Sequence, residues 1–316
     1  MPFPPGKTAF VFPGQASQYV GMGSDLHNEF ESVKSIYSEA FDILGFDLSD
    51  ISFNGPIEKL TQTSVTQPAI FVHSYSVTTL MSERGIKPSF TAGHSLGEFS
   101  AYAAAGAMNF SDVLRIVKIR ADAMQKACEL NPGTMAAIIG MEIEPLEIIC
   151  GEVSKSGVVN IANLNSPGQL VISGDVDSVH NVMALAKEQG AKIVKELNVS
   201  GAFHSPLMAS AVDELSDKLE SISISPPLFP VYTNVSALPL TQPEEIRNSL
   251  LKQITSPVQW YPLVQNMVND GATNFVEIGP GKILQGLMKR INKEIISSGI
   301  DKLESLTEIF ELDEFT

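Results

Sequence analysis

Residues 89–107 read SFTAGHSLGEFSAYAAAGA, and the interpretation of the whole chain starts from this stretch. A short β-rich run at 89–92 leads into Gly93-His94-Ser95-Leu96-Gly97, and an alanine-rich helical pattern follows at 98–107. A Gly-x-Ser-x-Gly sequence between a strand and a helix is typical of a nucleophile elbow, in which small residues flank a sharply turned serine. The alternative is an ordinary Gly-Ser turn at the start of a helix.

On both sides of this stretch, short β-rich runs alternate with longer helical patterns, which favours an α/β fold with a parallel sheet. Predicted strands lie at 7–12, 89–92, 228–234 and 273–278, and predicted helices at 24–44, 67–83, 98–107 and 111–130. Gly279-Pro280-Gly281 is expected to open a further helix. The acidic sequence after Gly299 is expected to be a terminal helix or a frayed end.

The segment 133–199 has a different order of elements. Strands are predicted at 134–139, 158–162, 169–173 and 192–199, with helices at 144–155 and 176–189. This βαββαβ order is that of a ferredoxin-like unit. We therefore expect residues 1–130 and 200–316 to form a large, hydrolase-like catalytic subdomain with an inserted small subdomain at 131–199. The cleft between the two is the expected ligand site.

The composition excludes several classes of function. Among 316 residues there are 21 Lys and Arg against 36 Asp and Glu, a net charge of −15, which argues against nucleic-acid binding. No apolar run approaches the roughly 18 residues of a membrane span. Residues 1–6 carry no apolar stretch of a secretory signal, and Cys128 and Cys150 are too few for a disulfide framework, so we expect a cytoplasmic protein. Histidine and cysteine spacing predicts no metal site.

A nucleophilic serine needs a base, and the chain has five histidines. His204 is the best placed, because it lies in the loop SGAFHSP (200–206) that returns the chain from the small subdomain to the cleft. The other four are poorer candidates: His94 is expected to point away from the serine, His27 and His180 lie among polar residues of surface-like helices, and His73 follows an apolar run.

Arg120 is the most informative charged residue. In the predicted helix 111–130 it falls within the apolar stripe marked by Val113, Val117 and Met124. A guanidinium that faces the interior must be paired, because burying an unpaired charge costs several kcal/mol. Two interpretations stay open: a structural ion pair with an internal carboxylate, and a bidentate clamp for the carboxylate of a ligand.

Together with further motifs, these segments resemble the malonyl-CoA:acyl carrier protein transacylases, in the acyltransferase family of fatty acid and polyketide synthesis. The resemblance covers roughly residues 7 to 295. Its other motifs are FPGQASQ (12–18), TQPA (66–69), IRADAMQ (119–125), NLNSPGQ (163–169), GAFHS (201–205), PVQW (257–260) and EIGPGK (277–282).

The resemblance implies an activity and its main residues. The enzyme would transfer malonyl from malonyl-CoA to the phosphopantetheine thiol of an acyl carrier protein, in fatty acid biosynthesis. The mechanism would be ping-pong, through a malonyl ester on Ser95. His204 would act as general base and acid, and Arg120 would bind the malonyl carboxylate. Coenzyme A thioester and carrier protein would be the partners, with no bound cofactor.

The resemblance also implies supporting roles. Backbone N–H groups of Gln15 and Leu96 would form the oxyanion hole, and Gln253 would hold His204. Asn163 and Asn165 would face the coenzyme A arm. Phe203, beside the base, is the bulky choice that goes with malonyl over methylmalonyl in similar enzymes.

An acidic carrier protein needs a local basic surface on this acidic chain. Lys282, Lys289 and Lys293 are spaced by seven and four residues after Gly281, which would place them on one helix face, with Arg290 adjacent. We hypothesise that these four residues dock the carrier protein; the alternative is an ordinary solvated face.

Three rival functions remain. A serine hydrolase or thioesterase would need no carboxylate clamp. A discrete acyltransferase of a polyketide assembly line would use the same catalytic residues. A non-catalytic interaction module would be expected to have lost Ser95, His204 or Arg120, and all three are present.

Overall fold

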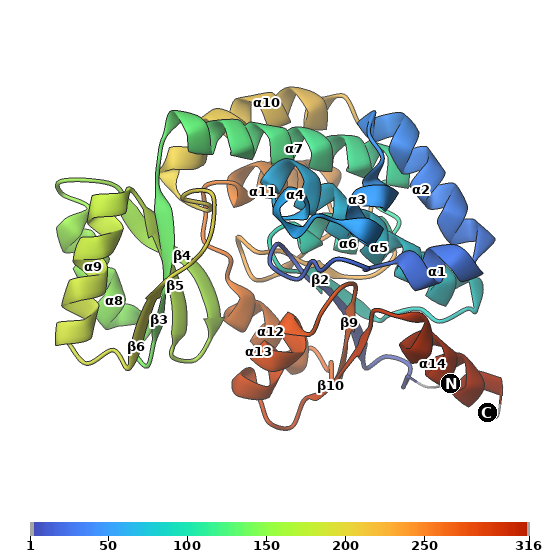
Figure 1. Cartoon of the computed structure of the whole chain (residues 1–316). Helices are drawn as coiled ribbons and strands as arrows, with labels where there is room; N and C mark the ends of the chain where they lie inside the picture. The colour runs from blue at the N-terminus through green and yellow to red at the C-terminus, as the bar shows by residue number, and fades with distance from the viewer. Residues whose placement is uncertain (1–2, 315–316) are drawn as a thin grey trace.

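The computed structural model describes residues 3–314, which form a larger and a smaller body (Figure 1). The larger body is built on a six-stranded sheet in the order β10-β9-β1-β2-β7-β8. Its strands are β1 Thr8–Phe12, β2 Phe90–Gly93, β7 Val231–Tyr232, β8 Pro239–Leu240, β9 Asn274–Ile278 and β10 Ile296–Ile300. Neighbouring strands run parallel except β7 and β8. The predicted α/β fold with a parallel sheet is confirmed.

Both faces of the main sheet are buried, because successive side chains of a strand point to opposite sides. In β1, Phe10 and Phe12 join one hydrophobic core, whereas Ala9 and Val11 join another. The second core is closed by α12 Trp260–Asn269 and α13 Ile283–Ile291. The first is closed by α1 Ser24–Glu29, α2 Glu31–Leu44, α3 Leu48–Asn54, α4 Ile57–Leu60, α5 Thr63–Glu83, α6 Gly97–Ala104, α7 Phe110–Leu130, α10 Ala209–Glu220, α11 Pro243–Gln253 and α14 Leu303–Glu314.

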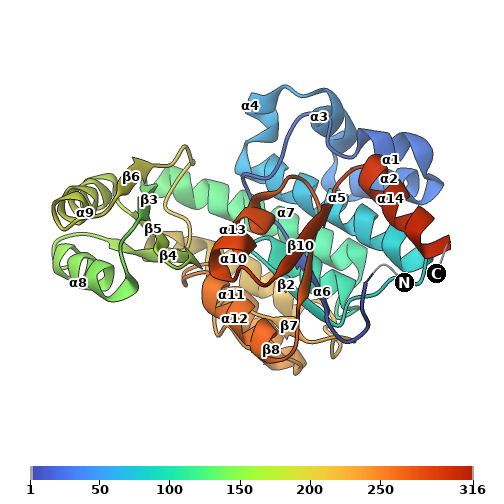
Figure 2. The same cartoon turned by 90° about the horizontal axis from the view of Figure 1, so that it is seen from below.

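The smaller body is a four-stranded antiparallel sheet with two helices. Its elements are β3 Thr134–Ile139, α8 Ile143–Val153, β4 Val159–Ser166, β5 Gln169–Gly174, α9 Val176–Glu188 and β6 Ile193–Glu196, and its strand order is β4-β5-β3-β6. The predicted βαββαβ order is therefore confirmed. Helices α8 and α9 lie on the side of the sheet away from the larger body in both views (Figures 1 and 2).

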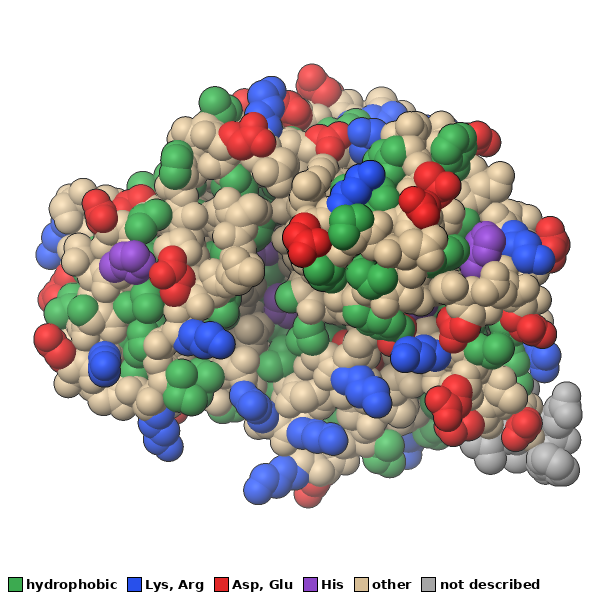
Figure 3. Space-filling model, in the orientation of Figure 1, with side chains coloured by type: hydrophobic (Ala, Val, Ile, Leu, Met, Phe, Trp, Pro, Cys, Tyr) green, Lys and Arg blue, Asp and Glu red, His purple; other side chains and the backbone are tan. Residues whose placement is uncertain are grey.

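The other face of this small sheet is turned toward the larger body. In β3, Ala136 and Ile138 pack with α8 and α9, whereas Met135 and Ala137 line a cavity shared with the larger body. The edge strand β4 is also tied to the larger body, since Val258 donates to the Ala162 carbonyl at 2.8 Å and accepts from the Leu164 N–H at 2.9 Å. The space-filling view shows the two bodies separated by a hollow (Figure 3). The sheet thus supplies one wall of a cleft.

Several predicted boundaries were wrong. The helix predicted at 24–44 is interrupted at Phe30, whose backbone is extended. The helix predicted to begin at 67 begins at Thr63 and includes Pro68. The strand predicted at 228–234 shrinks to β7, and the tail after Gly299 is preceded by an unpredicted strand, β10.

The ends of the expected large subdomain, residues 1–2 and 315–316, lie outside the described residues. Within residues 3–314, the structure contains no helix with both the length and the apolar character needed to span a bilayer.

Candidate active site

The serine of the predicted elbow lies where β2 ends and α6 begins. Ser95 has a φ of 51°, a conformation that non-glycine residues adopt only at a cost. The flanking glycines are required by space. A Cβ on Gly93 would collide with the backbone of Gly97, and a Cβ on Gly97 would collide with the Phe12 carbonyl of β1. The elbow is therefore pressed against the main sheet, and its tightness explains the Gly-x-Ser-x-Gly pattern.

His204 is the histidine that reaches this serine. Its Nε2 lies 2.8 Å from Ser95 Oγ, and its Nδ1 lies 2.9 Å from the backbone carbonyl of Gln253. A carbonyl can only accept, so Nδ1 carries the proton and Nε2 is left free to accept the proton of the serine. Gln253 thus lies against His204, and the contact is made by its main chain and not by its side chain.

The surroundings keep His204 neutral. The residue is 3% exposed and, like Ser95, has a positive φ, 57°. Burial, and after it the nearby charge of Arg120, lower the pKa of His204 to about 3. A neutral imidazole is the form that can act as a general base.

Arg120 is buried beside the serine. It is 1% exposed, and its Nη2 donates to Ser95 Oγ and to Gln253 Oε1, each at 3.0 Å, while Nη1 donates to Gln67 Oε1 at 2.6 Å. Its Nε has no partner among the described residues, and the guanidinium stacks over Phe99, 5.5 Å from the ring centre.

The ion pairs formed within residues 3–314 do not include Arg120. The interpretation as a structural ion pair in direct contact with a carboxylate is therefore wrong. Burial lowers the pKa of Arg120 to about 10, and the charge of Glu98 acts in the opposite direction. The guanidinium remains a cation at neutral pH with neutral partners only, which suits it to bind an anion.

Gln15 and Leu96, whose backbone N–H groups are the predicted oxyanion donors, both line the cavity beside Ser95. Neither N–H donates to another group within the described part of the chain. Leu96 is the residue just before α6, where the helix dipole favours negative charge. Both N–H groups are thus available to an oxyanion.

The cavity holds about 350 Å³ and is lined by both bodies of the molecule. Asn163, Asn165 and Phe203, all predicted to face the substrate, border it. Asn165 accepts from His94 Nε2 at 2.9 Å, so His94 does point away from Ser95. The smaller body therefore contributes directly to the pocket around the nucleophile.

Three polar residues of the site were missed by the sequence analysis. Gln67 accepts from Arg120; Asn234 accepts from the Ser95 N–H at 2.7 Å and donates to the Gly93 carbonyl; and Glu98 is a buried carboxylate that anchors Asn234 and Gln253. Gln67 and Glu98 stand inside or beside motifs already noted, so a signal was present for both. Asn234 is separated from Ser95 by 139 residues, and no local pattern marks it.

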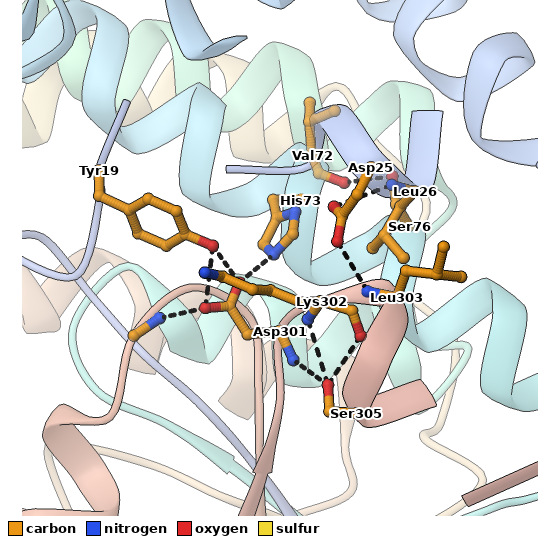
Figure 4. Close-up of polar contacts among 11 residues, drawn as sticks. Tyr19, Asp25, Leu26, Val72, His73, Ser76, Asp301, Lys302, Leu303 and Ser305 are labelled. Atoms are coloured by element: carbon orange, nitrogen blue, oxygen red, sulfur yellow. Dashed lines mark hydrogen bonds and ion pairs between the residues drawn. The ribbon is translucent and has the colours of Figure 1, made fainter. Parts of the chain in front are cut away.

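His73 is a core histidine, as predicted, but it has an unpredicted partner. Its ring is 0% exposed and lies 2.9 Å from Asp301, which follows β10. Asp301 also accepts from the Tyr19 hydroxyl and the Gly281 N–H, so three distant segments converge on one carboxylate (Figure 4). Of the remaining histidines, His27 packs edge-on against Tyr37 and at a tilt against Phe53, and His180 pairs with Glu196 at the surface.

The four basic residues proposed for docking are all exposed. Lys282 precedes α13 and Lys289 and Arg290 lie in its last turn, but the helix ends at Ile291. Lys293 therefore lies beyond the helix, and the prediction that it shares a helical face was wrong. Figure 3 shows Lys and Arg side chains gathered on the surface below the hollow. Arg290 contacts Gln169, so this surface lies beside the small sheet.

Comparison with known proteins agrees with this geometry. The family described as acyl transferase domain matches residues 9–306. The malonyl CoA-acyl carrier protein transacylase of Bacillus subtilis (strain 168) is 42% identical over 301 residues, covering 95% of each chain.

Two solved structures are equally similar. An acyl carrier protein S-malonyltransferase from Vibrio cholerae has 40% identity and a TM-score of 0.93, covering 96% of this chain and 99% of that one. A malonyl-transacylase in complex with a type II polyketide synthase acyl carrier protein, PlMCAT:AntF, has 39% identity and a TM-score of 0.92 at the same coverage. The chain belongs to the acyl transferase domain family, among the malonyl-CoA:acyl carrier protein transacylases.

Proposed function

We propose that this protein transfers malonyl from malonyl-CoA to the phosphopantetheine thiol of an acyl carrier protein, in fatty acid biosynthesis. One observation carries the proposal. A buried guanidinium without a carboxylate partner among the described residues lies 3.0 Å from a serine that a neutral histidine can deprotonate. A dicarboxylic acid with one of its two acid groups in a thioester supplies both a free carboxylate for Arg120 and a carbonyl carbon for Ser95 to attack.

The first half-reaction makes a malonyl ester of Ser95. His204 Nε2 takes the hydroxyl proton as Oγ attacks the thioester carbonyl. The negative charge that develops on the carbonyl oxygen is stabilised by the N–H groups of Gln15 and Leu96. When the tetrahedral intermediate collapses, the carbon–sulfur bond breaks and His204 returns the proton to the departing coenzyme A sulfur.

The second half-reaction transfers the malonyl group. The phosphopantetheine thiol gives its proton to His204, and its sulfur attacks the ester carbonyl of malonyl-Ser95. The same N–H groups hold the oxyanion. The carbon–oxygen bond to Ser95 then breaks, and His204 protonates Oγ, which restores the starting state. The mechanism is ping-pong, because coenzyme A leaves before the carrier protein's thiol reacts.

Selectivity follows from the groups around the acyl chain. Arg120 binds the malonyl carboxylate, and an acyl group without a carboxylate would leave that charge unpaired. Phe203 is 7% exposed and borders the cavity next to His204, where its bulk disfavours a methyl branch. Asn163 and Asn165, at the cavity wall formed by the small sheet, are assigned to the coenzyme A or phosphopantetheine arm.

The carrier protein is proposed to dock on Lys282, Lys289, Arg290 and Lys293. All four are exposed beside the cavity-lining helix α13, and a basic surface complements an acidic partner. We also place the subdomain boundaries at 130/131 and 199/200, and we propose a cytoplasmic location, supported by two free, buried cysteines.

The test is intact-mass measurement after mixing with malonyl-CoA. The wild type should gain one malonyl group and Ser95→Ala none, and added holo-carrier protein should discharge the ester with the group appearing on its thiol. Release of free malonate without transfer would identify a thioesterase instead. The preferred carrier protein, from fatty acid or polyketide synthesis, separates those two pathways.

A further inference from the structure

A buried carboxylate next to the catalytic groups belongs to Glu98, a residue that the reaction above does not use. Glu98 lies in the first turn of α6 and is 0% exposed. Its Oε2 accepts from the backbone N–H of Asn234 at 3.0 Å and from Nε2 of Gln253 at 2.7 Å. Its Oε1 has no hydrogen-bond partner within residues 3–314. A buried carboxyl is costly and needs a reason.

Both partners of Glu98 hold the nucleophile. Asn234 binds the elbow on each side of His94, accepting from the Ser95 N–H and donating to the Gly93 carbonyl. Gln253 donates from Nε2 to the Ser95 carbonyl at 3.0 Å. Glu98 therefore anchors the two residues that fix a serine held at positive φ, Asn234 through its backbone N–H and Gln253 through its side chain.

Gln253 also contacts the other two catalytic groups. Its side-chain Oε1 accepts from Arg120 Nη2 at 3.0 Å, and its backbone carbonyl accepts from His204 Nδ1. The orientation of its amide is therefore important. If the amide were rotated by 180°, its NH₂ group would face the guanidinium. Both groups are donors, so the hydrogen bond between Arg120 and Gln253 would be lost.

Glu98 fixes this orientation together with the Ser95 carbonyl, which accepts from the same Nε2 at a longer distance. The Oε2 atom of the carboxyl group can only accept in its two contacts, so it selects the amide rotamer that presents Nε2 to Glu98 and Oε1 to Arg120. Glu98 and Arg120 are thus connected through a single amide, with a negative group at one end and a positive group at the other. Burial raises the pKa of Glu98 to about 7, and Oε2 remains an acceptor in either protonation state.

We propose that Glu98 is a positioning residue: it fixes the amide of Gln253, and through it the guanidinium of Arg120, so that Arg120 meets the carboxylate of the acyl group. This inference rests on the proposed function, because the property it alters is the preference for a carboxylate-bearing acyl group.

The test compares Ser95 acylation by malonyl-CoA and by acetyl-CoA in Glu98→Ala and Glu98→Gln. Glu98→Ala should lower kcat/KM for malonyl-CoA by about 10- to 100-fold, as expected when a binding group is misplaced by an ångström. The malonyl-to-acetyl ratio should fall by about tenfold or more, since the acetyl group has no carboxylate for Arg120 to bind. Glu98→Gln keeps an acceptor oxygen and should restore the ratio to within about threefold of wild type.

Two further variants separate positioning from stability. Glu98→Leu fills the space without an acceptor and should match Glu98→Ala, which keeps the test available if the alanine variant does not fold. Val33→Ala removes buried volume from α2, far along the chain from the site, and should lower the melting temperature without moving the ratio.

An unchanged malonyl-to-acetyl ratio in Glu98→Ala or Glu98→Leu overturns the inference, and so does a ratio in Glu98→Gln as low as in Glu98→Ala. Failure of the proposed function has a different signature, because the wild-type Ser95 itself would then not be malonylated.

Discussion

Nη2 of Arg120 lies 3.0 Å from Oγ of Ser95, so the proposed carboxylate-binding group and the proposed nucleophile are in direct contact. Because Oγ accepts from Arg120, its own proton is directed to the free Nε2 of His204, 2.8 Å away. The same cation also lowers the cost of negative charge on Oγ during attack. In the proposed mechanism, a single buried arginine therefore serves both the activation of the serine and the recognition of the acyl group.

Removing this cation should abolish selectivity. Arg120→Ala should lower kcat/KM for Ser95 acylation by malonyl-CoA by roughly 30- to 1000-fold, the equivalent of losing a buried charge-assisted contact worth about 2–4 kcal/mol. Acylation by acetyl-CoA should fall much less. Arg115→Ala, on the same helix with a half-exposed side chain, is the matched control. A malonyl preference that survives in Arg120→Ala counts against the clamp.

The pH dependence of acylation should reveal the neutral base. With the pKa of His204 lowered to about 3 by burial and by Arg120, the imidazole is fully deprotonated at pH 5, and kcat/KM for malonyl-CoA should not fall between pH 7 and 5 because of this residue. A histidine with an ordinary pKa near 6.5 would lose about 30-fold over that range. In Arg120→Ala the charge that lowers the pKa of His204 is gone. The loss of kcat/KM at acid pH, measured with acetyl-CoA, should therefore begin closer to neutral pH.

Glu98, unlike His204, titrates near neutrality, because burial raises its pKa to about 7. The profile is therefore recorded in Glu98→Gln as well. A 30-fold loss at pH 5 that persists in Glu98→Gln would show that His204 is an ordinary base.

The sequence predicted those parts of the fold and site that leave a local pattern. The βαββαβ segment was recognisable because its strands and helices are short and regularly spaced. Ser95 was marked by glycines that steric contact requires, and Arg120 by a charge in an apolar stripe. The break at Phe30 was not predictable, since no glycine or proline stands at that position. Strand β7 was overestimated because hydrophobic residues continue beyond its two paired positions.

Contacts between distant segments left no such pattern. The clamp of Asn234 on the elbow spans 139 residues, and the bond between Gln253 and Glu98 spans 155. Sequence motifs marked the residues to which we assign the chemistry, whereas the residues that hold them became visible only when the strands were assembled. The basic patch was misjudged in a smaller way, because the end of α13 before Lys293 has no glycine cap to announce it.

The basic patch predicts an effect confined to the second half-reaction. Reversing Lys289 and Lys293 to Glu should raise the apparent KM for the carrier protein by about three- to tenfold and make it less sensitive to salt. Acylation of Ser95 by malonyl-CoA should be unchanged. Lys155→Glu with Lys187→Glu makes the same change in charge on exposed residues at α8 and α9 and should leave that KM unaltered. No change in KM for the Lys289/Lys293 variant would exclude this surface.

The network at Asp301 predicts a stability effect with no catalytic rationale. Asp301→Ala leaves the Nε2 of buried His73, the Tyr19 hydroxyl and the Gly281 N–H without their acceptor. A buried polar group left without a hydrogen-bond partner costs about 1–3 kcal/mol. The free energy of unfolding, measured by urea denaturation, should therefore fall by roughly 2–4 kcal/mol.

Asp301→Asn keeps one acceptor oxygen and should lose less stability. Asp217→Ala, an exposed aspartate on α10, is the control. If Asp301→Ala unfolds at the same urea concentration as Asp217→Ala, the carboxylate does not secure β10 and α14 to the rest of the larger body, and the attachment must come from the apolar packing of Ile300 and Leu306 alone.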